Sequence, residues 1–441
     1  MDIVSYRGPQ SPGGVSCFLQ NLFYDPRLDI DGWWFLASNR FRHVSRCSQS
    51  SFSLSACQAE LIERYCHYSN AFLWPLFHGF EHLVEYDVCS RQSYRKVGRL
   101  MADAILQSQL NQSVFVNDYQ LAMLPRLLAG GGLRQSSFFW HIPWPKEIPA
   151  PFAEPVSELA LGISCASRIG FQTDEYAQNF LSFFARRFPS LTANVESSIV
   201  IAPVAVDHEL WATLSEDEVR RERVLNNLDI KETDKVILSV ERADYTKGVL
   251  ERLEAIAVFL QSQDRSNVRG LRFVQVVPRT RAGLPAYDLY WQMCHQRVRE
   301  INDAHRLPGW EPIVLVEEHQ AAADLACLYA RADIMLITAI ADGLNLTAKE
   351  YVACHQGRSG ALILSRGCGV ASELQEPAFM IDPLSPHVVA ESIAAALEFP
   401  DDELRGRMTR ARAIVAANGA RRWLSCVRPP SASGRSLAEI S

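Results

Sequence analysis

The sequence has no C-x-x-C pair and no long apolar run. Its 11 cysteines are an odd number, scattered from Cys17 to Cys426. This pattern argues against a disulfide framework and a zinc site, and it predicts reduced thiols in a cytoplasm. Arg7 comes before any apolar stretch long enough for a signal peptide, so we expect no export. The apolar run 334–338 is far shorter than the ~20 residues of a membrane-spanning helix, so we expect no membrane insertion.

The sequence also has no excess of positive charge. Its 44 lysines and arginines face 50 acidic residues, which gives a net charge of −6. No global field draws such a chain to nucleic acid or anionic lipid, and no repeat of stacking aromatics is present. An anionic ligand must therefore meet a local cluster of cations. Only six of the 44 basic residues are lysine, so the position of each lysine is informative.

The length of 441 residues predicts two domains, because a single hydrophobic core stops growing at roughly 250–300 residues. Short apolar runs alternate with longer amphipathic segments, which is typical of an α/β fold with parallel sheets. The predicted strands are 113–116, 137–140, 168–171, 198–206, 236–240, 272–277, 312–316, 333–338 and 361–365. Helices are expected at 16–23, 249–261, 286–301 and 322–330. The polar stretch 207–234 marks the seam between domains 1–206 and 207–424, and the Pro/Ser-rich residues 425–441 predict a disordered tail.

The segment 239–248 lies between an apolar strand and an amphipathic helix. Ligands of open α/β sheets bind at the carboxyl ends of strands, where helix N-termini also point. Arg242 and Lys247 are five residues apart in this segment, and both stay cationic at neutral pH. They could hold a diphosphate, because the arginine fork engages two oxygens at once. The alternative is a solvated loop with incidental charges.

A second segment, 342–350, follows the predicted strand 333–338. Gly343 allows a ligand to approach the backbone, and the N–H groups that open a helix form an anion-binding concavity. Asp342 and Glu350 lie about two helical turns apart, where one could bind a sugar hydroxyl and the other a ribose. The alternatives are that Asp342 caps the helix and that Glu350 is an ordinary paired helix charge.

Polar residues near the N-terminus and after two further strands complete the candidate set. The loop 8–15 contains a glycine pair that would let a phosphate approach the backbone, but most such loops are only turns. Arg7, Tyr65 and Trp74 could line a polar pocket, although Trp74 also suits a core. Asp118 and His141 each come just after an apolar strand, where either could instead be a satisfied buried group.

In this order, these segments resemble the trehalose-6-phosphate synthase family of retaining glycosyltransferases over about residues 1–424. The strongest matches are 242–248, with the family pattern R-x-D-Y-x-K-G, and 342–352. Weaker matches are Tyr65 with Ser69-Asn70 and Leu73-Trp74-Pro75, Asp118-Tyr119, His141-Ile142-Pro143 and Gly170-Phe171-Gln172-Thr173. The sequence departs from the family pattern at Asn117, where His is usual, at Thr347, where Val is usual, and at 339–341.

The resemblance implies the GT-B architecture, in which two Rossmann-like domains face each other across a cleft. It assigns acceptor binding to domain 1–206 and nucleotide-sugar binding to domain 207–424, which ends in a final helix. The implied catalytic residues are Arg242, Lys247, His141 and Asp118. The implied donor-binding residues are Gly14, Asp342, Gly343, Leu344, Asn345, Leu346 and Glu350. The implied ligands of the acceptor phosphate are Arg7, Tyr65, Trp74 and Arg281.

The resemblance also implies the reaction. Glucose would move from UDP-glucose or ADP-glucose to glucose 6-phosphate with retained configuration, giving trehalose 6-phosphate without a metal or other cofactor. A separate phosphatase would act next, and a homo-oligomer is compatible with the sequence. Three alternatives stay open: transfer to glycerol 3-phosphate by a glucosylglycerol-phosphate synthase, coupling of cyclitols, and a non-catalytic regulatory or binding subunit.

Overall fold

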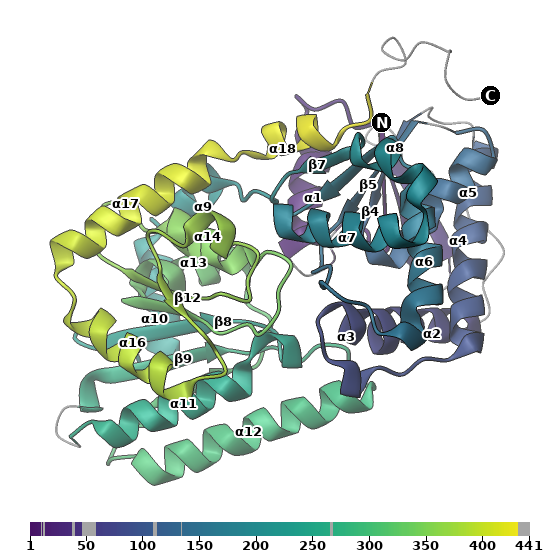
Figure 1. Cartoon of the computed structure of the whole chain (residues 1–441). Coiled ribbons are helices and arrows are strands. Elements are labelled where there is room, and N and C mark those ends of the chain that lie inside the picture. The colour runs from purple at the N-terminus through teal and green to yellow at the C-terminus, as the bar shows by residue number, and fades with distance from the viewer. Residues whose placement is uncertain are drawn as a thin grey trace. The chain divides into compact units, whose positions relative to one another are not determined.

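The computed structural model describes residues 1–9, 11, 14–37, 40–45, 59–108, 113–133, 135–264 and 268–430. The chain forms two compact units (Figure 1). Unit 1 comprises Met1–Val204 together with the residues from Ala420 onward, and unit 2 comprises Ala205–Gly419. In the described ranges, no helix is both long and apolar enough to cross a bilayer.

Unit 1 is built on a seven-stranded sheet in its described part, with the order β3-β2-β1-β4-β5-β6-β7. All neighbouring strands are parallel except the hairpin of β2 and β3. The strands are β1 (Asp2–Ser5), β2 (Gly32–Ala37), β3 (Arg40–Ser45), β4 (Ser113–Asn117), β5 (Gln135–Trp140), β6 (Arg168–Phe171) and β7 (Ile199–Ile201). The helices are α1 (Gly14–Tyr24), α2 (Ala59–His67), α3 (Trp74–Phe77), α4 (Val88–Ser108), α5 (Leu124–Gly130), α6 (Ala153–Ile163), α7 (Asp174–Arg187), α8 (Thr192–Glu196) and α18 (Ala420–Val427).

Unit 2 is built on a six-stranded parallel sheet in its described part, with the order β10-β9-β8-β11-β12-β13. The strands are β8 (Lys235–Val240), β9 (Leu271–Val276), β10 (Ile313–Val316), β11 (Ile334–Ile337), β12 (Ala361–Ser365) and β13 (Phe379–Ile381). The helices are α9 (His208–Leu214), α10 (Glu218–Asn227), α11 (Val249–Ser262), α12 (Pro285–His305), α13 (Ala322–Arg331), α14 (Leu346–Cys354), α15 (Ala371–Leu374), α16 (Pro386–Glu398) and α17 (Asp401–Ala417). In Figure 1, α11, α12 and α16 lie on one side of the sheet, and α9, α13, α14 and α17 lie on the other.

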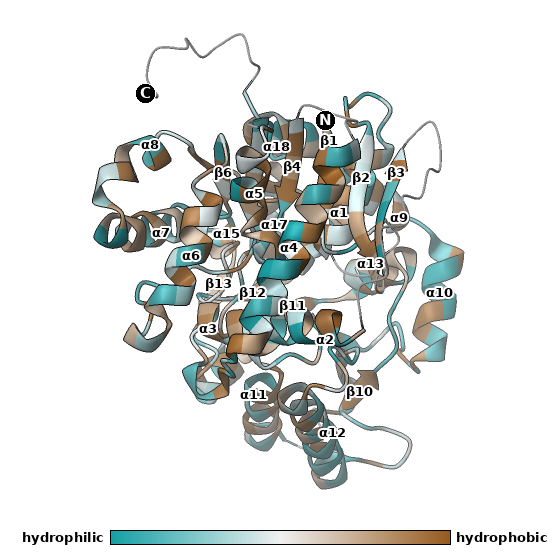
Figure 2. Cartoon of the chain, turned by 90° about the vertical axis from the view of Figure 1, so that its right-hand side faces the viewer, coloured by the Kyte–Doolittle hydropathy of each residue, from teal (hydrophilic) through white to brown (hydrophobic). Residues whose placement is uncertain are grey.

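The strand composition explains why both sheets lie inside their units. Strands β9, β11 and β12 are buried along their whole length, and they consist mostly of Val, Ile, Leu and Phe. Helices cover both faces of a parallel sheet, so its strands read as continuous apolar runs. Figure 2 shows the same separation, with β4 coloured as hydrophobic and α10 carrying both polar and apolar residues. Both sheets follow the Rossmann strand order 3-2-1-4-5-6, and that of unit 1 continues with β7.

The C-terminal helix α18 belongs to unit 1, whereas the sequence analysis assigned residues up to 424 to the second domain and predicted a disordered tail from 425. Trp423 is the reason for this difference. Its ring packs edge-on against Phe18 at a centroid distance of 4.9 Å and contacts Phe115 and Phe139. Its indole N–H donates to the Ala202 carbonyl at 2.8 Å. The helix continues to Val427, so residues 425–427 are ordered, and 431–441 lie outside the described residues.

The predicted strands and helices are present with small changes in length. The predicted strand 198–206 is the main exception, because only Ile199–Ile201 pairs as β7. Pro203 comes two residues after the end of this strand and has no N–H to donate to a sheet. The hairpin of β2 and β3 and the edge strand β13 were not predicted. Strand β3 begins with alternating exposed and buried residues, including two arginines, which differs from the continuous apolar run used to recognise the other strands.

Candidate active site

The donor-binding residues predicted in unit 2 gather after two neighbouring strands. Strands β8 and β11 are parallel neighbours, so their carboxyl ends lie on the same side of the sheet. The order of the sheet reverses between these two strands, because β9 and β10 lie beyond β8 while β12 and β13 lie beyond β11. Such a reversal is where ligands bind in open α/β sheets. The loops 241–248 and 338–345 follow β8 and β11 at this point.

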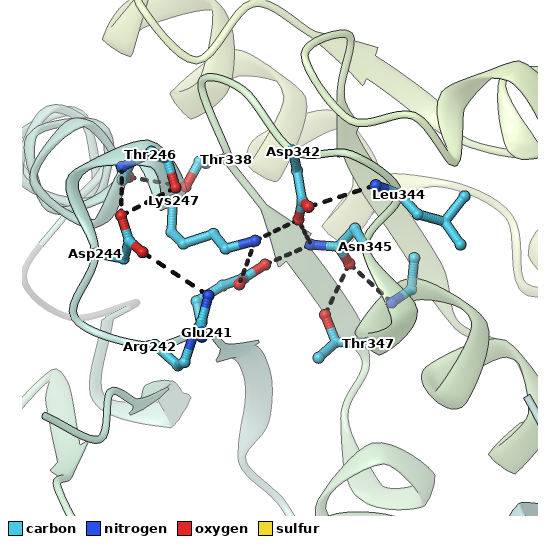
Figure 3. A network of polar contacts seen from close by, with 12 residues as sticks. Glu241, Arg242, Asp244, Thr246, Lys247, Thr338, Asp342, Leu344, Asn345 and Thr347 are labelled. Atoms are coloured by element: carbon cyan, nitrogen blue, oxygen red, sulfur yellow. Dashed lines mark hydrogen bonds and ion pairs between the residues drawn. The ribbon is translucent and has the colours of Figure 1, made fainter. Parts of the chain in front are cut away.

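Lys247 links the two loops through a buried ion pair. Its ammonium lies 2.5 Å from Asp342 Oδ2 and 3.9 Å from Glu241 Oε2 (Figure 3). Burial alone would lower the pKa of Lys247, but the two carboxylates outweigh that effect and raise the pKa above its ordinary value. Lys247 is therefore cationic at neutral pH. Burial raises the pKa of Glu241, against the opposing effect of Lys247.

Asn345 fixes both carboxylates and also starts helix α14. Its amide nitrogen donates to Glu241 Oε1 at 2.6 Å and to Asp342 Oδ2 at 3.1 Å. Its side-chain oxygen accepts from the Ala348 N–H at 3.1 Å and so caps the helix. The cap is therefore Asn345, and the alternative interpretation of Asp342 as the cap is wrong. Gly343 and Leu344 are buried in the same loop, and Leu346 is the first helical residue.

Asp244 holds two arginines and the loop of Lys247 together. This carboxylate is fully buried, and its Oδ1 accepts from the Thr246 N–H and hydroxyl at 3.1 and 3.0 Å. Its other oxygen, Oδ2, lies 3.8 Å from Arg242 and 3.3 Å from Arg281. Arg281 also donates to the hydroxyl of Tyr287 and lies over its ring. The predicted diphosphate ligand Arg242 and the predicted acceptor ligand Arg281 thus share one carboxylate oxygen.

Glu350 lies in α14, next to this cluster in sequence. The Tyr329 hydroxyl donates to Glu350 Oε2 at 3.0 Å. Burial raises the pKa of Glu350 from an ordinary value of 4.5 to about 7, although the hydrogen bond from Tyr329 opposes the rise. The carboxyl group is therefore partly protonated at neutral pH. An ionised Glu350 is a strong acceptor for hydroxyl donors, which is the chemistry that the resemblance assigns to it.

The catalytic residues predicted in unit 1 follow β4 and β5. Asp118 comes directly after β4 with φ 77°, a conformation that few residues other than glycine adopt. Its Oδ1 accepts from the N–H groups of Tyr119 at 2.9 Å and His141 at 3.1 Å. His141 comes directly after β5, and its ring lies between the side chains of Asn117 and Gln172. The structure thus brings Asp118 and His141 into direct contact.

Two predicted acceptor residues pack around the turn after Asp118. The Tyr65 hydroxyl donates to the Gln120 carbonyl at 3.0 Å, and this side chain is buried. The Trp74 ring packs on the buried His78 at 4.1 Å, and its centroid lies 6.0 Å from the Tyr119 ring. Both aromatics therefore shape the surroundings of Asp118 and also serve the core of unit 1.

The two remaining predicted residues of unit 1 lie nearer the N-terminus. Arg7 is exposed just after β1, which is the neighbour of β4 in the sheet. Gly14 is exposed at the first position of α1, and Gly13 lies outside the described residues. Arg281 belongs to unit 2, apart in the chain from the other predicted ligands of the acceptor phosphate.

Several polar residues of these clusters received no role from the sequence. Glu241 and Asp244 flank Arg242 within the matched segment, and buried carboxylates are the expected partners of clustered cations. Gln172 lies in the matched Gly-Phe-Gln-Thr stretch, and Asn117 precedes Asp118. Within the described ranges, no group of three or more His, Cys, Asp or Glu side chains is placed to hold a metal ion.

Comparisons with known proteins show which family the chain belongs to. Residues 38–428 match the model of Glycosyltransferase family 20. A bifunctional trehalose-6-phosphate synthase/phosphatase from Thermoproteus tenax is 31% identical over 81% of this chain, and the chain spans 50% of that protein. A trehalose-6-phosphate synthase from an Enterobacter species is 30% identical, with 85% of this chain and 80% of that protein covered.

Solved structures give the same result for the fold. The crystal structure of a UDP-forming alpha,alpha-trehalose-phosphate synthase from Burkholderia xenovorans, in complex with glucose-6-phosphate, has a TM-score of 0.86. It is 25% identical and covers 96% of this chain and 98% of that one. A related protein from Burkholderia vietnamiensis, at 24% identity, has a TM-score of 0.84 and covers 96% of each chain. The chain therefore belongs to Glycosyltransferase family 20, the trehalose-6-phosphate synthase family, and it has the GT-B fold with two Rossmann-like domains.

Proposed function

We propose that this protein transfers glucose from a nucleotide-glucose donor to glucose 6-phosphate, with retention, to form trehalose 6-phosphate. The observation that carries the proposal is the cluster after β8 and β11, where Arg242 and the buried Lys247 supply the cations that a leaving diphosphate needs. The names of the similar proteins and the glucose-6-phosphate bound to the Burkholderia xenovorans structure support this substrate pair.

The charges of the cluster determine how it acts. When the bond between the glucose carbon and the diphosphate oxygen breaks, the sugar becomes oxocarbenium-like and the diphosphate gains negative charge. Arg242 and Lys247 stabilise that charge more strongly in the transition state than in the substrate. The acceptor hydroxyl forms the new bond on the same face of the sugar, and its proton passes to the leaving diphosphate oxygen. Asp118 orients the acceptor, and no protein nucleophile is required.

An assay with matched substrates tests this proposal. UDP-, ADP- and GDP-glucose are each combined with glucose 6-phosphate and with glycerol 3-phosphate, and the products are identified by mass spectrometry and NMR. We expect an α,α-linked disaccharide phosphate from glucose 6-phosphate. Product from glycerol 3-phosphate alone would instead support a glucosylglycerol-phosphate synthase. Nucleotide-sugar binding without turnover of either acceptor would indicate a non-catalytic member of the family.

Replacement of Lys247 tests the role of the cluster. Lys247→Ala should lower kcat by on the order of 10²–10³, the usual cost of removing one electrostatic donor from an active site. Lys235→Ala is the control, because Lys235 belongs to the same unit and its ion pair with Asp333 is exposed. A Lys247→Ala variant with full transfer activity would exclude the proposed diphosphate clamp.

We further propose that transfer needs no metal, because the two cations supply the charge that a metal would bring, and EDTA should leave the rate unchanged. A separate phosphatase would consume the product. This succession of steps is supported by the name of the similar Thermoproteus tenax protein, which joins a synthase and a phosphatase activity. A homo-oligomer is the third proposal, and light scattering of the purified protein would test it.

A further inference from the structure

The ring of His141 is enclosed by two amide side chains from neighbouring strands. Its Nε2 lies 2.7 Å from Asn117 Oδ1, at the end of β4, and its Nδ1 lies 3.1 Å from Gln172 Nε2, just after β6. All three side chains are buried, and His141 is 6% exposed. The Phe139 ring covers the imidazole at a centroid distance of 4.5 Å. Both ring nitrogens therefore have a partner inside unit 1.

The backbone N–H of Val204 determines which end of the Gln172 side-chain amide is the oxygen and which is the NH₂ group. The N–H of Val204 points at Gln172 Oε1 at 2.9 Å. Because a backbone N–H can only donate, the atom that it meets must be an oxygen, and the other end of the Gln172 amide must be the NH₂ group. That NH₂ group donates to His141 Nδ1, so Nδ1 carries no proton. A neutral imidazole then carries its proton on Nε2, which donates to the Asn117 oxygen.

The surroundings keep this ring uncharged. Burial lowers the pKa of His141 to about 3, so the imidazole is neutral throughout the physiological range. Asn117 and Gln172 are neutral, and the charged group nearest in the described contacts is Asp118, which meets the backbone N–H of His141 instead of its ring. Both ring nitrogens of this neutral imidazole are therefore engaged by amide side chains in this structure.

We propose that Gln172 is a positioning residue that locks His141 as the neutral Nε2–H tautomer and, through His141, holds Asp118 in place. Gln172 Oε1 accepts a hydrogen bond from the backbone N–H of Val204. Val204 is the last residue of unit 1 before the chain enters unit 2. The backbone N–H of His141 then supports the carboxylate of Asp118. The expected effect of Gln172 on turnover rests on the proposed glycosyl transfer. The tautomer of His141 follows from the hydrogen bonds and does not depend on that reaction.

Nitrogen NMR of the histidine side chains tests the tautomer directly. The full chain is labelled with ¹⁵N-histidine, and the signals of His141 are assigned by their loss in a His141→Gln variant. We expect a protonated Nε2 and an unprotonated Nδ1, unchanged between pH 6 and pH 8. A protonated Nδ1 or a doubly protonated ring at pH 7 would overturn the proposal. This measurement needs no turnover, so it stays decisive if the proposed reaction is wrong.

Gln172→Met tests the positioning role, because methionine has a similar length but no donor for Nδ1. We expect the single tautomer to be lost and kcat to fall about 10- to 100-fold, as a misplaced active-site group can cost about 10² in rate, with little change in KM for the donor. Gln178→Met is the control, since Gln178 is exposed on α7, six residues further along. Unchanged His141 signals with wild-type kcat in Gln172→Met would refute the role of Gln172.

Discussion

Glu350 gives the sharpest pH prediction of this structure. Its carboxyl group is desolvated in α14, and its pKa rises from 4.5 to about 7. A glutamine side chain at this position would have nearly the same shape, would still accept the Tyr329 hydroxyl, and would never ionise. Glu350→Gln should therefore leave stability nearly unchanged at low pH and increase it at high pH.

The size and sign of the effect follow from the two pKa values. Because the folded-state pKa is raised, the native state favours the protonated form, and its stability is fully present below pH 4.5. That stability is lost as the pH rises through about 7, because the folded protein must then hold an ionised buried carboxylate. At 1.36 kcal/mol per pKa unit, the difference is at most about 3 kcal/mol. Glu350 keeps part of its surface exposed, and solvent screening makes about 1–3 kcal/mol the realistic range.

Calorimetry of both proteins between pH 5 and pH 8 measures this difference. For a unit of about 200 residues, each kcal/mol shifts Tm by about 2–4 °C. The unfolding transition of unit 2 should thus rise by about 2–12 °C in Glu350→Gln relative to wild type at pH 8, and by much less at pH 5. Glu318→Gln is the control, because Glu318 is exposed and should show no such trend. An equal Tm difference at both pH values would refute the reasoning.

Nucleotide binding should be strongest at high pH, where the stability gained from a protonated Glu350 is lost. A ribose hydroxyl donates more strongly to an ionised carboxylate than to a neutral carboxyl or amide. The affinity of wild-type protein for the nucleoside diphosphate should therefore increase from pH 6 to pH 8, and Glu350→Gln should bind more weakly with a flatter pH profile. Isothermal titration at each pH would measure both. A profile of the variant as steep as that of wild type would exclude Glu350 as the titrating group.

Two further substitutions test how the site and its domains are built. Gly248→Ala should destabilise unit 2 by more than about 2 kcal/mol and lower kcat, because φ is +61° and a Cβ would lie 2.0 Å from the Thr338 carbonyl oxygen. Gly309→Ala is the control, with φ +71° and open space around the Cβ, and thermal unfolding should show a cost of only about 1–2 kcal/mol. Trp423→Phe should cost about 1–3 kcal/mol in unit 1, because it leaves the buried Ala202 carbonyl without its donor, whereas Ser425→Ala on the exposed side of α18 should be nearly neutral.

The sequence predicts most buried strands and misses the hairpin of β2 and β3 and the edge strand β13. A strand with both faces covered is mostly apolar, as in β9 and β11, so it is visible as a nearly continuous run. The edge strand β3 instead mixes exposed arginines with buried residues. Strand β2 is an apolar run that was nevertheless missed. Helix α18 was assigned to the wrong domain because its partners Phe18, Phe115 and Phe139 are nearly 300 or more residues away in the chain. Nothing local in the sequence indicates such a contact.

The cations of the candidate site were predictable, and the groups that hold them were not. Arg242 and Lys247 stand out because they follow a strand and because lysine is scarce. Asp342 was predicted as a donor-binding residue and Glu241 received no role, but neither was predicted as a partner of Lys247, since the 95 residues between Lys247 and Asp342 hide that contact. The pairing follows from the order of the sheet, which places β11 beside β8.

In the proposed reaction, the compensated charges of this cluster would favour a leaving diphosphate over the intact donor. Arg242, Lys247 and Arg281 are each paired with a carboxylate, so the site holds its cations in place without a ligand. An anion must then compete with Asp342 and Asp244 for those cations, and a weakly charged anion gains little. A diphosphate whose negative charge increases as the glycosyl bond breaks competes better at each stage of bond breaking. The interaction between the cations and the diphosphate is therefore strongest in the transition state. Such an interaction lowers the barrier, whereas one that is equally strong in the substrate complex only tightens substrate binding.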